Sequence, residues 1–164
     1  MSSSVETLPE AAEKAVGGKS ITVRVLRSFA EAEPHRAAWN EVVLQAGADV
    51  YQTSEWCRAW WNHYGKRREA HLLLFFSGDK LVGIVPAFTE TLWLGPARIR
   101  AAKLMGADFS LQFCNLPVLP EALDAAVSHA LRYFLGDQRC DVFVTGPLSG
   151  PSARMDEILA AGRR

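Results

Sequence analysis

One stretch in the middle of the chain constrains the fold more than any other. Two apolar runs, at residues 71–76 and 80–88, are separated by Ser77, Gly78 and Asp79. Because Gly and Asp adopt the backbone of tight turns, this stretch predicts an antiparallel β-hairpin. Pro86 lacks the N–H group that a β-ladder needs, so we expect it at an edge, a bulge or the end of a strand.

The residues around this hairpin predict further strands and helices. Alternating or β-branched runs predict strands at residues 21–27, 91–94, 98–105 and 141–145, the last of them an interior strand. Apolar residues at helical spacing predict helices at residues 34–46, 54–64 and 120–135, with one more beginning at Met155. Ser28 and Glu31 have the spacing of a capping box ahead of the first helix. Together these elements predict an α+β protein in which helices flank a mixed, largely antiparallel sheet with the hairpin in its middle.

The length and composition of the chain predict a single folded domain. A chain of 164 residues can bury a core of its own. Residues 1–19 are rich in Ser, Ala and Glu, so we expect a flexible tail followed by one domain at residues 20–164. Hydrophobic residues make up 49% of the chain, which is too much for a disordered protein. The longest apolar run, residues 72–76, is far too short for a membrane span, so we expect a soluble protein.

Charge and cysteine usage exclude several classes of function. The 18 basic and 18 acidic side chains cancel, and the one dense basic run, residues 66–68, is short, so nucleic acid is not an expected partner. The N-terminal residues lack the features of a secretory signal, which makes the cytoplasm the expected location. Cys57, Cys114 and Cys140 match neither a disulfide framework nor paired metal ligands. We expect reduced, buried thiols and no metal site.

Four motifs, taken in order, resemble those of one family. They are Trp39, then Val-Tyr-Gln-Thr-Ser-Glu-Trp at 50–56 followed by Trp60, Trp61 and Gly65, then Leu-Val-Gly-Ile-Val-Pro at 81–86, and finally Gly-Ala-Asp-Phe-Ser at 106–110. In this combination the chain resembles, from about residue 26 to residue 159, the N-terminal half of the CelD-like, FemAB-related acyltransferases of the GNAT superfamily.

The resemblance implies a GNAT-like domain and transfer of an acyl group from acetyl-CoA or another acyl-CoA to an amine. Such proteins resemble two GNAT-like halves, the second of which binds the acyl-CoA. Their phosphate loop, Gln/Arg-x-x-Gly-x-Gly/Ala, has no counterpart here, since the nearest stretch, 104–107, leads into Asp108, whose charge opposes a phosphate. We therefore assign no cofactor-binding residue, and expect a C-terminal GNAT-like half or a partner chain to supply the acyl-CoA site.

Asp108 is the candidate catalytic residue. It follows Gly106 in a loop after a predicted strand and precedes an aromatic residue, Phe109. The resemblance implies that Asp108 and Phe109 belong to the active-site groove. Turn chemistry alone would also favour an Asp at this position, so both interpretations stay open.

Trp56, Trp60 and His63 are the other candidate substrate-binding residues, on one stripe of the helix predicted at 54–64. Indole rings can form a stacking wall for a sugar or an acyl acceptor, but the same rings are suited to pack a helix on a sheet. Trp60 is also predicted, together with Trp39, to anchor the core. His63 has the chemistry of a general base near neutral pH, or is a surface residue at a helix end.

Two functions follow from these observations. The first is the N-terminal GNAT-like half of an N-acyltransferase that shapes the acceptor side of a groove. The resemblance suggests a small-molecule acceptor, such as an amino sugar or a cell-envelope or exopolysaccharide precursor. The second is a non-catalytic, truncated GNAT-like module that binds a partner, which the missing phosphate loop favours.

Overall fold

The computed structural model describes residues 20–106, 116–146, 156, 159–160 and 162. Five strands form one sheet in the order in which they occur along the chain. They are β1 (Ile21–Leu26), β2 (Glu69–Ser77), β3 (Lys80–Leu94), β4 (Ala97–Leu104) and β5 (Val142–Val144). Neighbouring strands are antiparallel except β4 and β5, which are parallel. The predicted α+β fold with a mixed, largely antiparallel sheet is confirmed.

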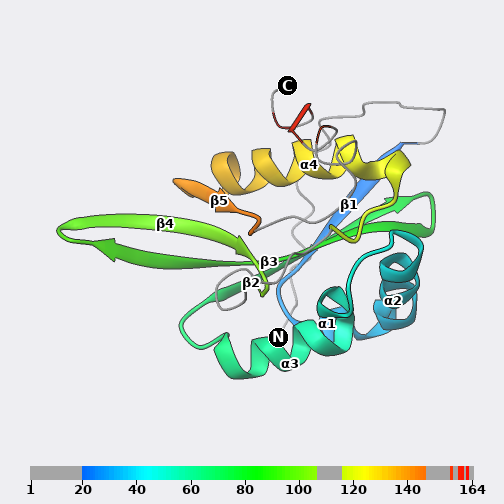
Figure 1. The fold of residues 1–164 in the computed structure, drawn as a ribbon, viewed down its shortest axis with the longest axis horizontal. Coiled ribbons are helices and arrows are strands. Elements are labelled where there is room, and N and C mark those ends of the chain that lie inside the picture. The colour runs from blue at the N-terminus through cyan, green and yellow to red at the C-terminus, as the bar shows by residue number, and fades with distance from the viewer. Residues whose placement is uncertain (1–19, 107–115, 147–155, 157–158, 161, 163–164) are drawn as a thin grey trace, which may run out of the picture.

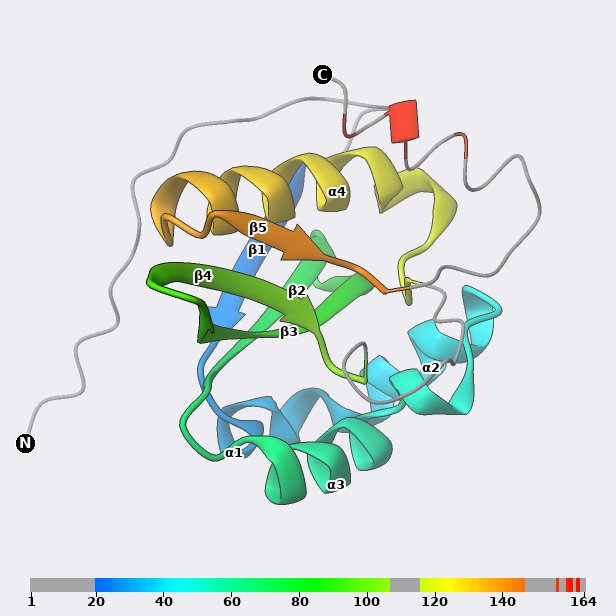
Figure 2. The same ribbon diagram turned by 60° about the vertical axis from the view of Figure 1, so that its left-hand side comes forward.

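Helices cover both faces of this sheet. Helices α1 (Phe29–Ala32), α2 (Arg36–Gln45) and α3 (Ser54–Tyr64) lie on one face, and α4 (Leu123–Leu131) lies on the other, as Figures 1 and 2 show. Short helical turns adjoin them at η1 (Glu33–His35), η2 (Val50–Gln52), η3 (Pro120–Ala122) and η4 (Arg132–Asp137), the last with π-helical hydrogen bonding. The continuous helical stretch from η3 to η4 matches the helix predicted at 120–135.

The first helical segment begins earlier than predicted. The Ser28 hydroxyl accepts a hydrogen bond from the backbone N–H of Glu31, and the Glu31 carboxylate accepts one from the N–H of Arg27. Ser28 is therefore confirmed as the N-cap that starts α1 at Phe29, whereas the Glu31 carboxylate binds the N–H of the residue before the cap and not that of Ser28 itself. Pro34 lies in η1, between α1 and α2, where a tighter turn tolerates its missing N–H group.

The predicted hairpin is confirmed as the β2–β3 pair in the middle of the sheet. Its turn includes Gly78, whose φ of +61° suits a residue without a side chain. The strands predicted separately at 80–88 and 91–94 are a single strand, β3. Pro86 lies inside β3, one residue beyond the last pair with β4, and its carbonyl accepts a hydrogen bond from the N–H of Met105 at 2.9 Å. The nitrogen of Pro86 therefore faces the β4 side of β3, just beyond the last residue pair of the two strands, so the ladder loses no hydrogen bond within its paired residues.

The core contains the two tryptophans that were predicted to anchor it. Trp39 is fully buried and Trp60 is 6% exposed. The Nε1–H of Trp39 donates a 2.7 Å hydrogen bond to the backbone carbonyl of Gln52, which ties α2 to the turn before α3. Cys57 and Cys140 are buried, reduced cysteines, as expected, and burial raises the pKa of the Cys140 thiol.

One strand prediction is wrong in its position. The run at 141–145 was expected to form an interior strand, but among the described residues β5 pairs with β4 alone and lies at the edge of the sheet. Val142 is 37% exposed as a result. A β-branched run favours a strand but does not distinguish an edge from the centre.

Several predictions concern residues outside the described part of the chain. They are the tail at 1–19, the candidates Asp108 and Phe109, Cys114, and most of the helix expected from Met155. In the described residues no helix is long and apolar enough to cross a membrane.

Candidate functional site

The parallel strands β4 and β5 end side by side at one edge of the sheet. Lys103 of β4 pairs with Val144 of β5, and both strands run in the same direction. Carboxyl ends of adjacent parallel strands form the crevice in which open sheets most often bind ligands. Gly106 follows β4 at this point, and Thr145 and Gly146 follow β5. The carboxyl ends of β4 and β5 therefore form the candidate site at this edge of the sheet.

Trp56 lies against the backbone of Gly106 at this edge. A Cβ atom added to Gly106 would lie 3.0 Å from Cη2 of the Trp56 ring and 3.2 Å from its Cζ3. Gly106 also has a φ of +90°, which residues with a side chain rarely adopt. Both features require glycine here, and together they place the indole of Trp56 beside the residue that opens the motif at 106–110.

Local structure holds Trp56 in this place. Thr53 caps α3 by accepting a hydrogen bond from the N–H of Trp56, which puts the indole in the first turn of the helix. The ring of Tyr51 meets Trp56 edge-on, with ring centres 5.4 Å apart. Trp56 is half-buried, so it combines a fixed orientation with an accessible surface. Such a ring can stack on a ligand.

Trp60 has a different role from Trp56. Its ring packs on Phe88 of β3 with centres 5.2 Å apart, and the Arg68 guanidinium lies over both rings. With 6% of its surface exposed, Trp60 offers little area to a substrate. Of the two roles considered for Trp60, the structure supports packing of the helix on the sheet and not stacking on a substrate.

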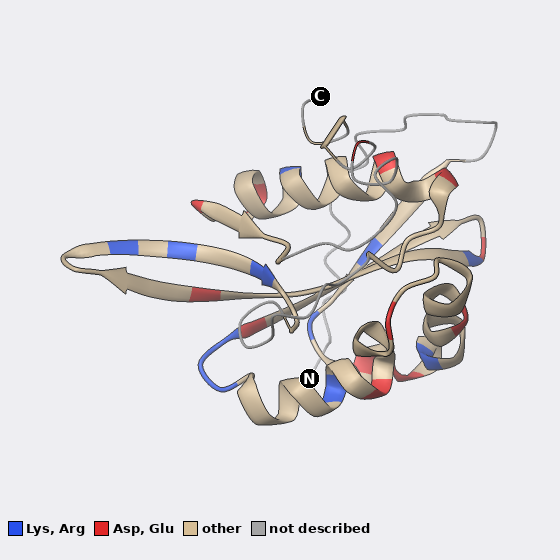
Figure 3. Ribbon diagram, in the orientation of Figure 1, with Lys and Arg blue, Asp and Glu red and all other residues tan. Residues whose placement is uncertain are grey.

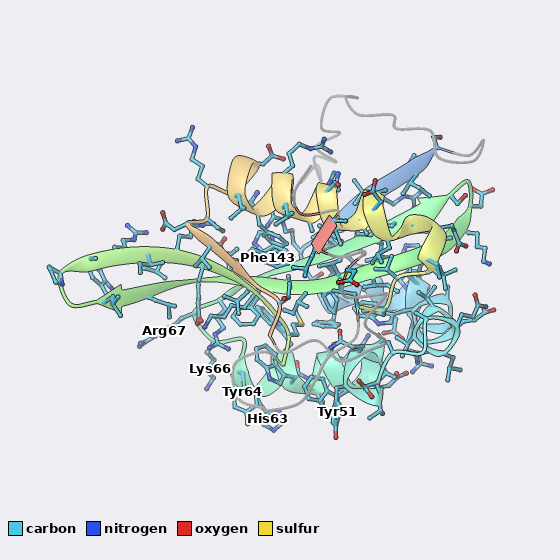
Figure 4. All side chains as sticks on the ribbon, turned by 45° about the horizontal axis from the view of Figure 1, so that its top comes forward. Tyr51, His63, Tyr64, Lys66, Arg67 and Phe143 are labelled. Atoms are coloured by element: carbon cyan, nitrogen blue, oxygen red, sulfur yellow. The ribbon has the colours of Figure 1, made fainter. Side chains whose placement is uncertain are left out.

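His63 lies at the other end of α3 from Trp56. Its Nδ1–H donates a 2.8 Å hydrogen bond to the backbone carbonyl of Ala59, and its side chain is exposed. It lines a shallow depression of about 400 Å³ together with Tyr64, Lys66 and Arg67, and Figure 4 shows these side chains gathered on one side of the molecule. The structure therefore does not bring His63 and Trp56 into one site.

A buried polar network on the opposite face of the sheet was not predicted. His71 of β2 is fully buried. Its Nδ1 lies 2.9 Å from the Tyr133 hydroxyl, its Nε2 lies 3.1 Å from the Thr89 hydroxyl, and the guanidinium of Arg27 contacts both ring nitrogens. The Thr89 hydroxyl in turn donates to the carboxylate of Glu69 at 3.2 Å. A chain of hydrogen bonds thus runs from η4 along one face of the sheet to the exposed carboxylate of Glu69.

This network keeps His71 neutral. Burial lowers its pKa to about 3, and the nearby positive charges of Arg27 and Arg100 act in the same direction. Burial also raises the pKa of Tyr133, so that its hydroxyl stays protonated. The sequence signal that could have identified this network was a histidine, His71, within a predicted apolar strand. Its partners come from β3, η4 and the end of β1, and only the register of the strands brings them together.

An apolar cavity of about 270 Å³ lies between α4 and the sheet, close to the end of β5. Its walls include Val85 of β3, Ala130 of α4 and Phe143 of β5. Phe143 stacks on Phe134 with ring centres 4.9 Å apart, and Figure 4 labels its position beneath α4. Such a cavity suits an alkyl or acyl group rather than a charged one.

Metal ligands and known relatives give no further information about the site. Among the described residues no group of His, Cys, Asp and Glu side chains is placed to hold a metal ion. No family model matches the chain, and no curated protein matches it at a significant level.

Proposed function

We propose that the chain is the acceptor-side, GNAT-like module of an N-acyltransferase located in the cytoplasm. In this proposal it binds an amine, such as an amino sugar or an envelope or exopolysaccharide precursor, at the edge formed by Trp56 and Gly106. Acyl-CoA is held by a C-terminal GNAT-like half or a partner chain. The amine then attacks the thioester carbonyl, the carbon–sulfur bond breaks, and the products are an amide and free CoA.

The contact between Trp56 and Gly106 is the observation that carries this proposal. It joins two of the motifs on which the family resemblance rests, although they are about 50 residues apart in the sequence. Asp108 follows Gly106 by two positions in the sequence. An aromatic wall and a carboxylate at one edge are suited to bind an amine, because the ring packs on the carbon skeleton and the carboxylate attracts the ammonium group.

The roles of the residues follow from their chemistry. An ammonium group must lose a proton before its nitrogen can attack a thioester. A carboxylate such as Asp108 can accept that proton, or can orient the ammonium group so that the proton passes to water. Trp56 would hold the acceptor in a fixed orientation, which is a large part of the catalysis of acyl transfer. We propose these roles for Asp108 and Trp56 alone, because Trp60 is buried in the core and supports the fold.

The alternative is a non-catalytic module that binds a partner. The missing phosphate loop favours it, as does the exposure of large apolar side chains on the β3–β4 hairpin. A module of this kind has no need of an amine site beside Gly106. Acceptor binding therefore separates the two functions.

The experiment measures acyl transfer to a panel of amines, with the chain combined with a GNAT domain that binds acyl-CoA. Asp108→Asn should lower kcat, because the change keeps the volume and removes the charge. Trp56→Phe should raise KM for the amine, while Trp61→Phe, the same change on the same helix, should leave KM unchanged. Equal effects of the two tryptophan changes, or full activity of Asp108→Asn, would contradict the proposal.

A further inference from the structure

The tip of the β3–β4 hairpin exposes large apolar side chains on both of its faces. Figure 1 shows this hairpin projecting beyond the helices that cover the rest of the sheet. Trp93 is 70% exposed, Leu94 is 71% exposed and Leu92 is 38% exposed. Because successive strand residues point to opposite faces, Trp93 lies on one face of the hairpin and both leucines lie on the other. A flat partner surface would cover only one of these faces.

Basic side chains lie beside the apolar tip and at the foot of the hairpin. The stretch from Thr91 to Arg100 contains two arginines and no acidic residue, and Arg98 is paired in register with Trp93. Lys66 and Arg67 belong to the loop at the foot of the hairpin, where they line the same depression as Thr91. Figure 3 shows basic residues along β4 and in this loop.

The acidic side chains near the foot of the hairpin already have basic partners. Glu90 accepts from Arg68 at 2.9 Å and is 2.7 Å from the ammonium nitrogen of Lys103. Glu69 is 3.1 Å from the guanidinium of Arg100. The other exposed charges near the hairpin are the positive ones of Lys66 and Arg67 at its foot and Arg98 near its tip, and the carboxylate of Asp141, which accepts a hydrogen bond from the backbone N–H of Arg100 at 2.8 Å.

We propose that this hairpin docks the protein on the surface of a bilayer that contains anionic phospholipid. Leu92, Trp93 and Leu94 enter the interfacial layer, where an indole ring combines apolar area with an N–H group that stays hydrated. Lys66 and Arg98 contact lipid phosphates, and each basic side chain near such a surface strengthens binding about fivefold. The protein lies on the membrane and does not cross it.

A bilayer fits this tip better than a second copy of the chain does. A symmetric dimer through the hairpin would bring two identical sets of positive charges together, whereas an anionic surface neutralises them. The interfacial layer also surrounds both faces of an inserted hairpin. It therefore covers Trp93 and Leu94 at the same time.

The first test is flotation of the protein with vesicles. Binding is expected to equimolar phosphatidylcholine and phosphatidylglycerol, to weaken at high salt, and to be much weaker with phosphatidylcholine alone. Trp93→Ser/Leu94→Ser should weaken binding at least about tenfold. The matched control is Leu44→Ser/Val50→Ser, which removes two exposed apolar side chains elsewhere and should bind like the parent protein. All four positions are exposed, so unchanged circular dichroism spectra are expected.

Two further variants locate the contact. Lys66→Gln and Arg98→Gln should each weaken binding about fivefold, whereas Lys80→Gln, at the β2–β3 turn, should not change it. Brominated lipid should quench part of the tryptophan fluorescence, and Trp93→Phe should abolish that part while binding is retained.

Three results would overturn the proposal. They are equal vesicle binding by the tip variant and its control, quenching that survives Trp93→Phe, and hairpin-dependent self-association or protein binding without any affinity for anionic vesicles. Sedimentation velocity of the lipid-free protein measures self-association. Amine acceptor binding is measured without lipid, so failure of this proposal leaves the proposed function intact.

Discussion

The hydroxyl of Tyr133 in η4 lies 2.9 Å from Nδ1 of His71 in β2, and both side chains are almost completely buried. Because Arg27 and Thr89 occupy the remaining polar positions around the imidazole, the ring is held as a neutral acceptor and donor. Protonation of His71 would break this arrangement and place a third positive charge near Arg27 and Arg100. The stability of the fold should therefore depend on pH through His71.

The predicted effect is a loss of stability in acid. The pKa of His71 is lowered to about 3 in the folded chain and returns to about 6.5 on unfolding, so the unfolded state binds one more proton between these values. The stabilisation is complete above about pH 6.5, and falls by up to about 1.4 kcal/mol per pH unit as the pH decreases towards 3. Urea unfolding at several pH values measures this slope.

His71→Gln provides the control for this prediction. Glutamine also donates and accepts hydrogen bonds but does not titrate, so the variant should be less stable at pH 7 and should lose much of the slope. Some slope remains from His129, whose pKa is lowered mainly by burial. An unchanged slope in His71→Gln would show that other groups are responsible.

Truncation of either core tryptophan should destabilise the protein strongly. Trp39→Ala and Trp60→Ala are each expected to lower the free energy of unfolding by about 3 to 5 kcal/mol, because each leaves a large cavity. Trp39→Ala also leaves the Gln52 carbonyl without its hydrogen-bond donor. Denaturant titration measures both losses, and values below about 1 kcal/mol for both would show that these helix faces are misassigned.

Gly106→Ala tests the contact with Trp56. The new Cβ would meet the indole at 3.0 Å and the φ is positive, so we expect a loss of about 2 kcal/mol or more. Gly47→Ala is the matched control, because Gly47 also has a positive φ but nothing lies within 4 Å of the added atom. It should cost about 1 kcal/mol.

A double variant completes this comparison. Phenylalanine lacks the outer ring atoms that the new Cβ would meet, so Gly106→Ala should cost less in a Trp56→Phe background than in the parent protein. Equal costs in the two backgrounds would mean that Trp56 does not contact Gly106 in solution.

Acetyl-CoA should bind weakly, if at all, to this chain. The phosphate loop of the family has no counterpart, and few backbone donors can surround a pyrophosphate without its glycines. A thermal-shift titration should show little change in Tm, since a ligand stabilises a protein only as far as it binds the native state. A large saturable increase in Tm would move the acyl-CoA site into this chain.

Much of the fold could be predicted because its signals are local. The turn at Gly78, the N-cap at Ser28 and the apolar spacing around Trp39 each determine nearby backbone without help from distant residues. The edge position of β5 could not be predicted, because the same β-branched run suits a central or an edge strand. The continuity of β3 was missed because the polar residues Thr89 and Glu90 separate the two runs that predicted strands at 80–88 and 91–94.

The candidate site was predictable only in part. Spacing on the helix placed Trp56 and Trp60 on one stripe, but their partners differ, since Gly106 lies beside one and Phe88 beside the other. Which ring is accessible depends on these long-range contacts. The network around His71 was missed for the same reason, because strand register and the position of η4 bring its members together.

The most direct test of the account is an NMR titration of the chain with an amino sugar, glucosamine, followed by ¹H–¹⁵N spectra. The account predicts chemical-shift changes at the Trp56 indole N–H and at the backbone amide of Gly106, with none at the His63 amide on the far end of α3. Glucose, which lacks the amine, and acetyl-CoA should cause much smaller changes. Shifts confined to other parts of the molecule, or equal responses to glucosamine and glucose, would contradict the assignment of an amine acceptor site to this edge.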